Sequence, residues 1–382
     1  FKNFNVLASA SMDYYQSMED IYNPAGPNTA NVGSATAGRG IADRYPQRSY
    51  NYSGFLTGTY EWLMNDESKF QFMAGTEYQE NFTRSYAMTL RDSAGNVTGQ
   101  RNFVEDAAGP FYSESDLRDN YEFDSVTTSF ISRFMSFFGR INYSYRDKYL
   151  AQVVLRSDGS SRFGPENRFG YFPSVSAGWI ISEERWMRDN RWFNYLKLKS
   201  SIGWIGNANL TSTEWRARYQ RNAAAYDGRD ILFPLNNPNP DLRWETTQVI
   251  DFGLEYGLFQ DRITGEIAYY NKQTSDVLLN VSLPRVSGFG SFYDNVGGLL
   301  NEGVEFQIKT RNLVGDFRWT TDFNIAYNYN EIVSLGGYSA DAVGGGTNDT
   351  RTIVGEPVGT NFLVRFSHVD PTTGQPVYLD ID

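Results

Sequence analysis

The feature that most restricts the fold of this chain is a pair of alternating segments between residues 248 and 272. They read QVIDFGLEYGLFQDRITGEIAYYNK, and a short break separates them. In both runs apolar side chains occupy every second position, as Leu254, Tyr256, Ile267 and Tyr269 do. Each run has about the nine to eleven residues that a tilted strand needs to cross a hydrocarbon layer. Aromatic side chains stand near the ends, where lipid meets water. The pattern is typical of a hairpin in a transmembrane β-barrel.

Repetition of this pattern separates a barrel from an ordinary sheet. A soluble antiparallel sheet alternates in the same way, so a single hairpin leaves both folds open. Roughly eleven or twelve such segments occur along the chain, more than a sandwich of ordinary size holds. Besides the hairpin, they cover residues 4–14, 54–62, 70–78, 139–145, 149–155, 175–181, 196–204, 304–310 and 317–330.

The connections between these segments also alternate in length. Short turns are expected at residues 65–68, 146–148, 259–262 and 312–316, with a longer one at 182–195. Long loops are expected at residues 16–50, 81–125, 158–171, 205–244, 274–302 and 331–361. Short periplasmic turns at one rim and long extracellular loops at the other are the asymmetry of bacterial outer-membrane barrels.

Composition is consistent with this prediction. With 34 basic and 45 acidic residues the formal charge is −11, which argues against a nucleic-acid partner. The mean hydropathy of −0.49 is that of a soluble protein, and no stretch has the eighteen or more apolar residues of a membrane helix. A barrel strand reconciles these facts, because only half of its residues face lipid. The 16% of aromatic residues suits an interfacial girdle, although aromatic packing in any β-protein is the alternative. The absence of cysteine excludes disulfides and thiolate metal sites.

The two ends predict that the chain is part of something larger. Phe1 opens directly into an alternating run, without the features of a signal peptide. The last residues, HVDPTTGQPVYLDID, are polar and do not alternate. A sheet in lipid must close to satisfy its edges, so we expect this chain to belong to a larger barrel.

Five ordered blocks carry a family resemblance. They are GRINYSYRDKYLAQVVLRSDGSSRFGPENRFGYFPSVSAGWIISEERWM, LKLKSSIGWIGNANL, NPNPDLRWETTQVIDFGLEYGLF, GFGSFYDNVGGLLNEGVEF and VGEPVGTNFLVRFSHVDPTTGQPVYLDID. Together they span about 240 residues from residue 139 onward, and the first 120 residues match more loosely. In these blocks the chain resembles SusC/RagA-type TonB-dependent outer-membrane transporters.

The resemblance implies an all-β fold, a 22-stranded transmembrane antiparallel β-barrel with a plugged lumen. Residues 1–382, with about twelve strands, are then the middle of one barrel domain, and the N-terminal plug and the final strands lie outside this chain. The implied location is the outer membrane of a Gram-negative bacterium of the Bacteroidota type. The implied partners are outer-membrane lipid, a SusD-like surface lipoprotein that covers the mouth as a lid, and the TonB–ExbB–ExbD complex, which acts through the plug. Two transporters often pair with two lids.

By the same resemblance, the function is TonB-dependent active import of a bulky nutrient, an oligosaccharide or a peptide. A plug and TonB box upstream of Phe1, and a neighbouring lid lipoprotein, would distinguish this function. The alternatives are a passive porin or a structural outer-membrane barrel in a larger assembly, and a soluble β-rich binding module. A porin would conduct ions without energy, whereas a soluble module would fractionate away from membranes.

Candidate site residues fall into two groups. Polar side chains on the face opposite the apolar one are expected to line the lumen, where they either hold the plug or solvate a channel: Arg140, Asn142, Lys197, Lys199, Glu305, Lys309, Arg318 and Asp322. In the family model, aromatic side chains of the long loops would contact substrate or pack the loops together: Trp204, Trp215, Tyr219, Tyr226, Phe289, Phe292 and Tyr293. Two glycine-rich loops, residues 156–164 and 288–298, are expected to need positive φ angles and to maintain the fold.

The sequence gives little support for catalysis. His368 is the only histidine, and no GxSxG elbow, GxGxxG or Walker A sequence is present, so we expect no enzyme. No cofactor is expected. A calcium ion is the one exception, because Asp370, Asp380 and Asp382 could supply oxygen ligands near Gly374, although their spacing fits no known loop motif.

Overall fold

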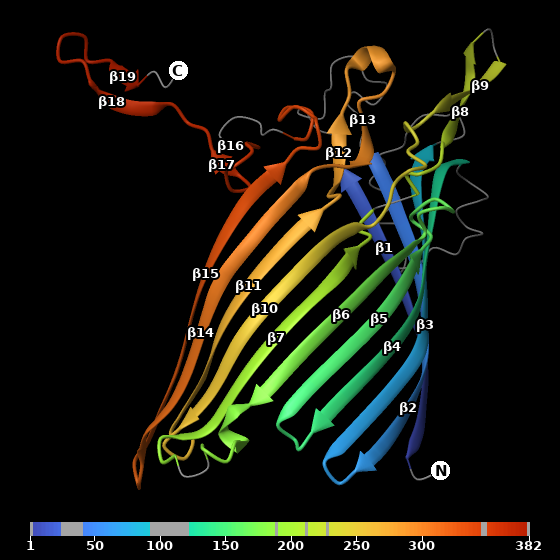
Figure 1. The fold of residues 1–382 in the computed structure, drawn as a ribbon. Coiled ribbons are helices and arrows are strands. Elements are labelled where there is room, and N and C mark those ends of the chain that lie inside the picture. Colours follow the sequence, from blue (N-terminus) through green and yellow to red (C-terminus); the bar gives the residue numbers. More distant parts are fainter. Residues whose placement is uncertain are drawn as a thin grey trace. The chain divides into compact units, whose positions relative to one another are not determined.

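The computed structural model describes residues 3–23, 41–91, 122–187, 190–210, 213–226, 229–344 and 350–379. Its main element is one sheet of eleven strands in the order β1-β2-β3-β4-β5-β6-β7-β10-β11-β14-β15 (Figure 1). Each of these eleven strands pairs with the one that follows it in this order, and the remaining strands form small hairpins in the loops. This arrangement confirms the prediction of an all-β antiparallel fold. The strands are β1 (Phe4–Asn23), β2 (Ile41–Asn65), β3 (Ser68–Arg91), β4 (Glu122–Tyr145), β5 (Tyr149–Ser160), β6 (Phe169–Ile180), β7 (Phe193–Asn207), β10 (Glu245–Leu258), β11 (Ile263–Ser275), β14 (Gly298–Val314) and β15 (Arg318–Ser334).

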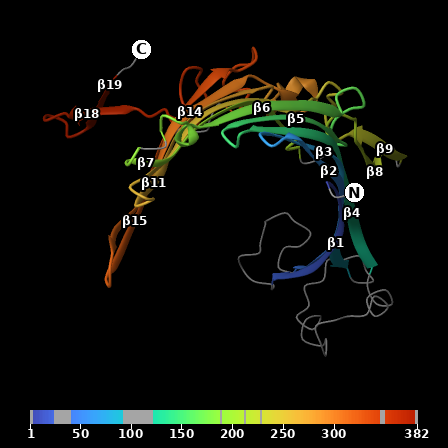
Figure 2. The ribbon, with the colours of Figure 1, turned by 60° about the horizontal axis from the view of Figure 1, so that its bottom comes forward.

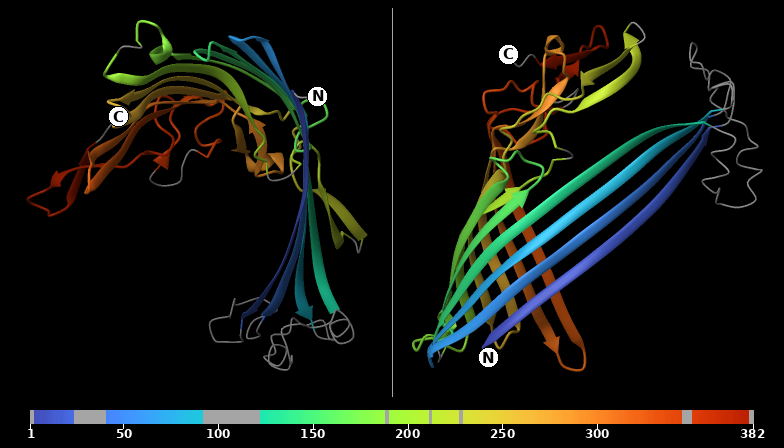
Figure 3. Two further views of the ribbon diagram at one scale, coloured as in Figure 1. Left: turned by 90° about the horizontal axis from the view of Figure 1, so that it is seen from below. Right: turned by 90° about the vertical axis from the view of Figure 1, so that its right-hand side faces the viewer.

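The chain divides into two compact units. Unit 1 comprises Phe1–Leu7, Leu56–Thr76 and Met135–Asp382, and unit 2 comprises Ala8–Phe55 and Glu77–Phe134. Strands β5 to β15 of unit 1 form one continuous curved layer (Figures 2 and 3). In this unit the tight turns lie at one end of the strands and the long connections at the other, as the sequence predicted (Figure 1).

The register separates the two sides of the sheet. Leu254 lies opposite Leu198 on β7 and Ile267 on β11. One position away, Gly253 lies opposite Lys199 and Ala268. The rows continue across β14 and β15 as Phe306 and Ile325 on one side and Glu305 and Ala326 on the other. A slip of one residue would exchange the two sides. We call the side of Leu254 the apolar face and the side of Lys199 the polar face.

Several strands extend beyond the segments that alternation predicted. Strands β1 to β4 have 20, 25, 24 and 24 residues, so the first two predicted loops begin too early and end too late. Backbone pairing can continue beyond a lipid layer without apolar alternation, because both faces then meet water. Parts of these two predicted loops, residues 24–40 and 92–121, lie outside the described residues. The later connections hold small hairpins: β8 (Tyr219–Tyr226) with β9 (Arg229–Pro234), β12 (Leu278–Ser282) with β13 (Ser291–Asn295), β16 (Thr350–Arg351) with β17 (Thr360–Asn361), and β18 (Arg365–Val369) with β19 (Pro376–Leu379).

The tight turns use left-handed backbone conformations. Between β4 and β5, Arg146 and Asp147 have φ angles of 53° and 54°. Between β10 and β11, three consecutive residues, Phe259, Gln260 and Asp261, have φ angles of 55° to 60°. These conformations are unfavourable for residues with a Cβ atom, so pairing of the flanking strands stabilises them.

Most buried apolar side chains of unit 1 lie in its connections, and the exceptions on the sheet are Phe172 on β6 and Ile332 on β15. Phe163 and Leu242 are 0% exposed, whereas Phe323 and Ile325 on the apolar face are 50% and 59% exposed. A lipid-facing surface produces this distribution, because acyl chains take the place of protein neighbours. The described helices are two short 3₁₀ turns, η1 (Ile181–Glu183) and η2 (Arg285–Ser287). Among the described residues, no helix has both the length and the apolar character to cross a membrane.

Candidate functional site

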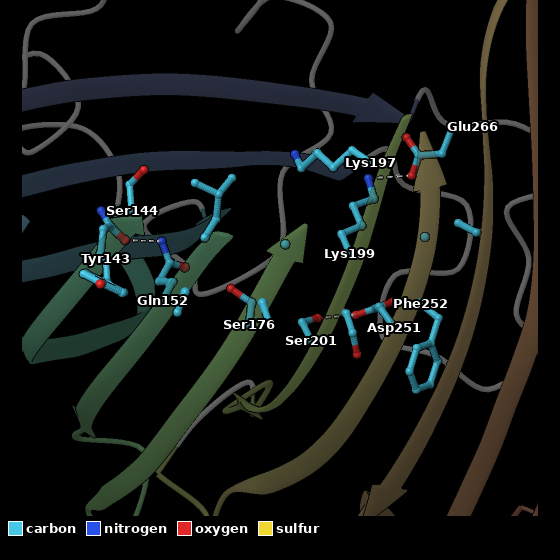
Figure 4. Close-up of a pocket in the computed structure, with 18 of the residues that line it drawn as sticks. Tyr143, Ser144, Gln152, Ser176, Lys197, Lys199, Ser201, Asp251, Phe252 and Glu266 are labelled. Carbon is cyan, nitrogen blue, oxygen red and sulfur yellow. Dashed lines mark hydrogen bonds and ion pairs between the residues drawn. The ribbon is translucent and has the colours of Figure 1, made fainter. Parts of the chain in front are cut away.

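A hollow of about 790 Å³ lies on the polar face of unit 1 (Figure 4). Its floor is recessed because small residues from four neighbouring strands stand there: Ser176 and Gly178 on β6, Ser201 on β7, Gly253 on β10 and Ala268 on β11. Larger polar side chains surround the floor. Hydroxyl, amide, carboxylate and ammonium groups therefore meet in one place, and the hollow can offer a ligand both donors and acceptors.

An ion cluster forms one margin of the hollow. Lys199 Nζ lies 2.9 Å from Glu255 Oε1 and 2.6 Å from Glu266 Oε1, and Lys197 Nζ lies 3.7 Å from Glu255 Oε2. Glu255 and Glu266 are directly opposite each other on β10 and β11. Like charges in that arrangement are unfavourable, so the lysines compensate a repulsion that the register imposes.

A glycine gives Lys199 its path to both carboxylates. A Cβ atom at Gly253 would lie 2.4 Å from Lys199 Cε and 2.9 Å from its Cγ. Because that space is empty, the lysine side chain crosses β10 and reaches Glu266 on β11. The hollow and the ion cluster therefore depend on the same glycine.

Amide side chains form the opposite margin. Gln152 Nε2 donates to Asn142 Oδ1 at 2.7 Å, and Asn142 Nδ2 donates to Gln71 Oε1 at 2.8 Å. Gln71 Nε2 then donates to Glu61 Oε1 at 3.1 Å, and Lys69 pairs with Glu61 at 3.7 Å. The chain of hydrogen bonds crosses four strands, β5 to β2, so the polar groups of this margin are satisfied by one another.

The structure brings together half of the side chains that the sequence predicted for the lumen. Asn142, Lys197, Lys199 and Glu305 all line the hollow. The other four lie elsewhere: Lys309 pairs with Asp322 at 3.3 Å, Arg140 donates to Met73 Sδ at 3.6 Å, and Arg318 begins β15 opposite Val314. Contact of any of these residues with a plug stays a prediction.

Sequence reasoning missed most of the hollow. Asp251 and Glu266 stand on the side that alternation marked as polar, so their phase in the sequence was the available signal. The floor residues carried no comparable signal, because serine, glycine and alanine are common at any strand position. Their recess becomes visible only when the register aligns them across four strands.

The long connections of unit 1 form a second candidate region, which we call the loop platform: residues 161–168, 208–210, 213–226, 229–244, 276–297 and 335–344. Two of its connections share a core in which Phe163, Leu210 and Leu242 are at most 1% exposed. Arg162 Nη1 donates to the Ala208 carbonyl at 2.9 Å, and burial lowers the pKa of Arg162. Trp215 Nε1 donates to the carbonyl of Ser161 at 3.4 Å. This part of the platform is packed like the interior of a soluble domain.

Asp294 joins three connections of the platform. Asn239 Nδ2 donates to Asp294 Oδ1 at 3.0 Å, and the Tyr338 hydroxyl donates to Asp294 Oδ2 at 2.7 Å. The hydrogen bond to the carboxylate raises the pKa of Tyr338. Below this junction, Val281, Val296 and Val343 form a small buried core. One aspartate therefore links its own connection to those of Asn239 and Tyr338.

The aromatic residues predicted to contact substrate occupy different places. Trp204 is in phase with Leu198 and Ile202, on the apolar face of β7, which suits the lipid–water interface better than a binding surface. Tyr219, at the start of β8, is 63% exposed, and the side chain of Tyr226 lies outside the described part of the chain. The others belong to the platform: Trp215 bonds to the β5–β6 loop, Phe292 packs on the valine core, Tyr293 pairs with Asn280, and Phe289 follows η2. Substrate contact by these residues stays a prediction.

The two glycine-rich loops use glycine for different reasons. Gly288 and Gly297 have positive φ angles of 83° and 65°, as predicted. The prediction is wrong for Gly290 and Gly298 in the second loop and for Gly159 and Gly164 in the first, which are not among the residues with positive φ. The two glycines of the first loop are crowded instead: a Cβ atom would lie 2.7 Å from the Phe169 ring at Gly159 and 2.8 Å from the Pro240 carbonyl oxygen at Gly164. Both uses maintain the fold of the platform.

Of the three acidic residues near the end of the chain that the calcium prediction named, the structure describes Asp370. Asp370 Oδ1 accepts hydrogen bonds from the hydroxyl and the backbone N–H of Thr372 at 2.6 and 2.8 Å, which lowers the pKa of Asp370 to about 2. Asp380 and Asp382 lie outside the described residues. Within the described ranges, no three histidine, aspartate or glutamate side chains are grouped to hold a metal ion. The calcium prediction stays untested.

A two-faced sheet of eleven strands with long connections at one end defines the fold. The family model described as TonB dependent receptor-like, beta-barrel matches residues 3–370. The chain belongs to this family. As a TonB-dependent receptor barrel it is part of an outer-membrane protein of the Bacteroidota type, as the sequence resemblance predicted.

The relatives confirm the SusC/RagA type. TonB-dependent receptor P26 of Formosa agariphila is 36% identical over 303 residues, which make up 76% of this chain and 31% of the relative. TonB-dependent receptor SusC of Bacteroides thetaiotaomicron is 38% identical over 211 residues, 53% of this chain and 21% of SusC. The structure of the RagAB peptide transporter shares the fold, with a TM-score of 0.82 and 24% identity over 99% of this chain and 40% of that chain. This chain thus spans less than a third of the curated relatives.

Proposed function

We propose that the protein containing this chain imports a bulky polar nutrient across the outer membrane, driven by TonB, and that it is not an enzyme. The polar face carries the proposal. Its charges and amides are satisfied across neighbouring strands while the opposite face exposes Phe252, Phe323 and Ile325. Such a sheet suits the wall of a wide, water-filled lumen in lipid. Membership of the TonB-dependent receptor family supports TonB as the source of energy.

The cargo we propose is an oligosaccharide or a peptide. The RagAB relative transports peptides, and the hollow offers hydroxyl, amide, carboxylate and ammonium groups, which suit either cargo. Tyr219, exposed at the base of the β8–β9 hairpin, is available to stack on a sugar ring or an aromatic side chain. The rigid loop platform would hold such contacts in place.

The partners we propose follow from the likeness to SusC and RagAB. A SusD-like surface lipoprotein would cover the mouth of the barrel, and two such transporter–lid pairs would assemble together. TonB–ExbB–ExbD would act through an N-terminal plug. Gentle purification of the full protein from outer membranes, followed by mass spectrometry, tests these partners. A stoichiometric lipoprotein supports the lid, whereas recovery of the barrel alone contradicts it.

Uptake by the full-length protein tests the activity. Cells that express it receive labelled oligosaccharides or labelled peptides, with TonB present or deleted. We expect one cargo class to enter only when TonB is present. A passive porin, which a hydrated polar face also suits, would admit small solutes equally in both strains and would conduct ions in a planar bilayer. Equal uptake without TonB would therefore contradict active import and support passive diffusion.

A further inference from the structure

The carboxylates of the ion cluster are bound to groups of the sheet itself. Lys199 contacts both Glu255 and Glu266, and Lys197 adds a second, longer contact to Glu255. All four side chains are partly open to solvent, with exposures between 23% and 38%. The cluster therefore faces whatever fills the lumen while its charges are already paired.

Lys199 links three strands, and the sheet is shaped for it. The side chain starts on β7, crosses β10 above Gly253 and ends at Glu266 on β11. Without it, Glu255 and Glu266 would face each other as an opposed pair of like charges, with only the 3.7 Å contact of Lys197 in compensation. Glu255 would keep Lys197 and the Tyr195 hydroxyl, which donates to its Oε2 at 3.4 Å, whereas Glu266 would have no ion-pair partner among the described residues.

From this geometry we infer that Lys199 is a positioning residue that keeps both glutamates bound to the barrel wall, so that the plug passes them without forming ion pairs. The inference rests on the proposed function, in which a plug leaves or rearranges during import. Freed carboxylates would recruit basic side chains from a polar plug. Charge-assisted hydrogen bonds are about twice as strong as neutral ones, and each would have to break during import. A wall whose charges are paired internally leaves weaker, hydrated contacts, which a pulling force can break at lower cost.

The test compares Lys199→Met with the wild type in full-length protein in the outer membrane. Two rates are measured: TonB-dependent uptake of the cargo, and passive influx of a large hydrophilic antibiotic that intact outer membranes exclude. We expect uptake to fall about tenfold, which corresponds to ~1.4 kcal/mol, with influx unchanged. Increased influx would mean that Lys199 itself retains the plug, and unchanged uptake would mean that the ion cluster does not affect release. Either result overturns the inference.

Further variants separate this role from a general loss of structure. Lys199→Arg retains the cation and should restore uptake. Lys199→Met combined with Glu266→Gln removes the unpaired charge while leaving the Lys197–Glu255 pair, and it should recover most of the uptake. If the double variant remains as slow as Lys199→Met, the inference is wrong. Gly253→Ala introduces a methyl group that displaces Lys199 Cε, so it disturbs the Lys199–Glu266 contact without removing the ammonium. If Lys199→Met does not assemble, the uptake rate of Gly253→Ala tests the inference in its place.

Lys272 provides the matched control. Its ammonium lies 4.7 Å from the centre of the Tyr270 ring, and within the described residues it pairs with no carboxylate. Lys272→Met therefore removes a lysine from β11, the strand that also carries Glu266, without freeing an acid, and uptake should stay at the wild-type rate. The two hypotheses fail separately: wild-type uptake without TonB contradicts the proposed function, whereas a TonB-dependent wild type with a leaky Lys199→Met contradicts only this inference.

Discussion

The loop platform and the strands of unit 1 place their apolar residues in opposite environments. In the platform, Phe163 and Leu242 are fully buried among protein atoms. On the apolar face, Phe252 and Ile267 remain 51% and 43% exposed although β10 and β11 are paired on both edges. The platform can therefore hold its shape in water by packing, whereas the strands rely on backbone hydrogen bonds and on lipid. A single chain thus combines the interior of a soluble protein with the surface of a membrane protein.

The largest expected effect comes from a matched pair of phenylalanine truncations. Phe163→Ala leaves a cavity in the platform core and should cost about 3–5 kcal/mol of local stability, because protein neighbours cannot fill the space. Phe323→Ala should cost much less, since acyl chains flow into the gap. Hydrogen exchange of the platform and of β15, measured in lipid, checks the pair. Equal losses at the two positions would contradict the contrast between the platform and the strands.

Arginine substitutions at two adjacent residues sharpen the comparison on the strands. Ile267→Arg places a charge on the apolar face and should destabilise the barrel by about 2–4 kcal/mol if the residue lies near the bilayer midplane. Ala268→Arg places the same charge on the polar face, beside Glu305, and should cost less than about 1 kcal/mol. Urea unfolding in lipid vesicles measures both. If Ala268→Arg were the more costly variant, the assignment of the faces would be reversed.

A smaller effect is expected at the junction of the platform. Tyr338→Phe removes the hydroxyl that donates to Asp294 Oδ2 and should cost about 1 kcal/mol, the usual contribution of one hydrogen bond. Proteolysis within residues 335–344 should become faster, while the strands stay protected. Tyr327→Phe on the exposed apolar face is the matched control and should change neither rate. Loss of strand protection in Tyr338→Phe would show that the platform also stabilises the sheet.

The smallest expected effect is a pH dependence in the turn between β18 and β19. The pKa of Asp370 is about 2 in the folded turn, below its ordinary value of 3.8, because Thr372 donates to the carboxylate. The stabilisation is therefore complete above pH 3.8 and is lost as the pH falls toward 2. The protection of the Thr372 amide from hydrogen exchange, relative to an unfolded peptide at the same pH, should be higher at pH 4 than near pH 2. In Asp370→Asn this pH dependence should be absent, and an unchanged profile would exclude the carboxylate as its cause.

The sequence predicted the strands far better than the hollow. Every alternating segment coincides with one of the eleven strands of the sheet. A strand with one apolar and one polar face requires apolar and polar residues to alternate in the sequence, so the strand can be predicted from it. The long extensions of β1 to β4 left no such period, so their ends were missed. The hollow depends on which residues of separate strands become neighbours. Asn142 and Gln152 are ten residues apart in the sequence, but Lys199 and Glu266 are 67 residues apart. No local sequence pattern predicts the contact between Lys199 and Glu266.

The platform shows the same limit. Trp215 and Phe292 are aromatic loop residues of the kind that bind sugars, and the sequence could not distinguish that role from packing. Trp215 bonds to Ser161 in the β5–β6 loop, and Phe292 packs on a core that includes Val343 from another connection. The sequence therefore predicted that aromatic residues would gather at this end of unit 1, and packing decided where each of them points.

Accessibility of adjacent side chains tests the central claim most directly: that the apolar face meets lipid and the polar face lines an aqueous lumen. This chain has no cysteine, so single cysteines at Ile325 and Ala326 can carry nitroxide labels in the full protein within lipid vesicles, once any cysteine outside this chain is replaced. Molecular oxygen, which concentrates in lipid, should relax the label at residue 325 more strongly than a water-soluble nickel chelate does, and at residue 326 the order should be reversed. The same order at both residues, or the opposite one, would contradict the account.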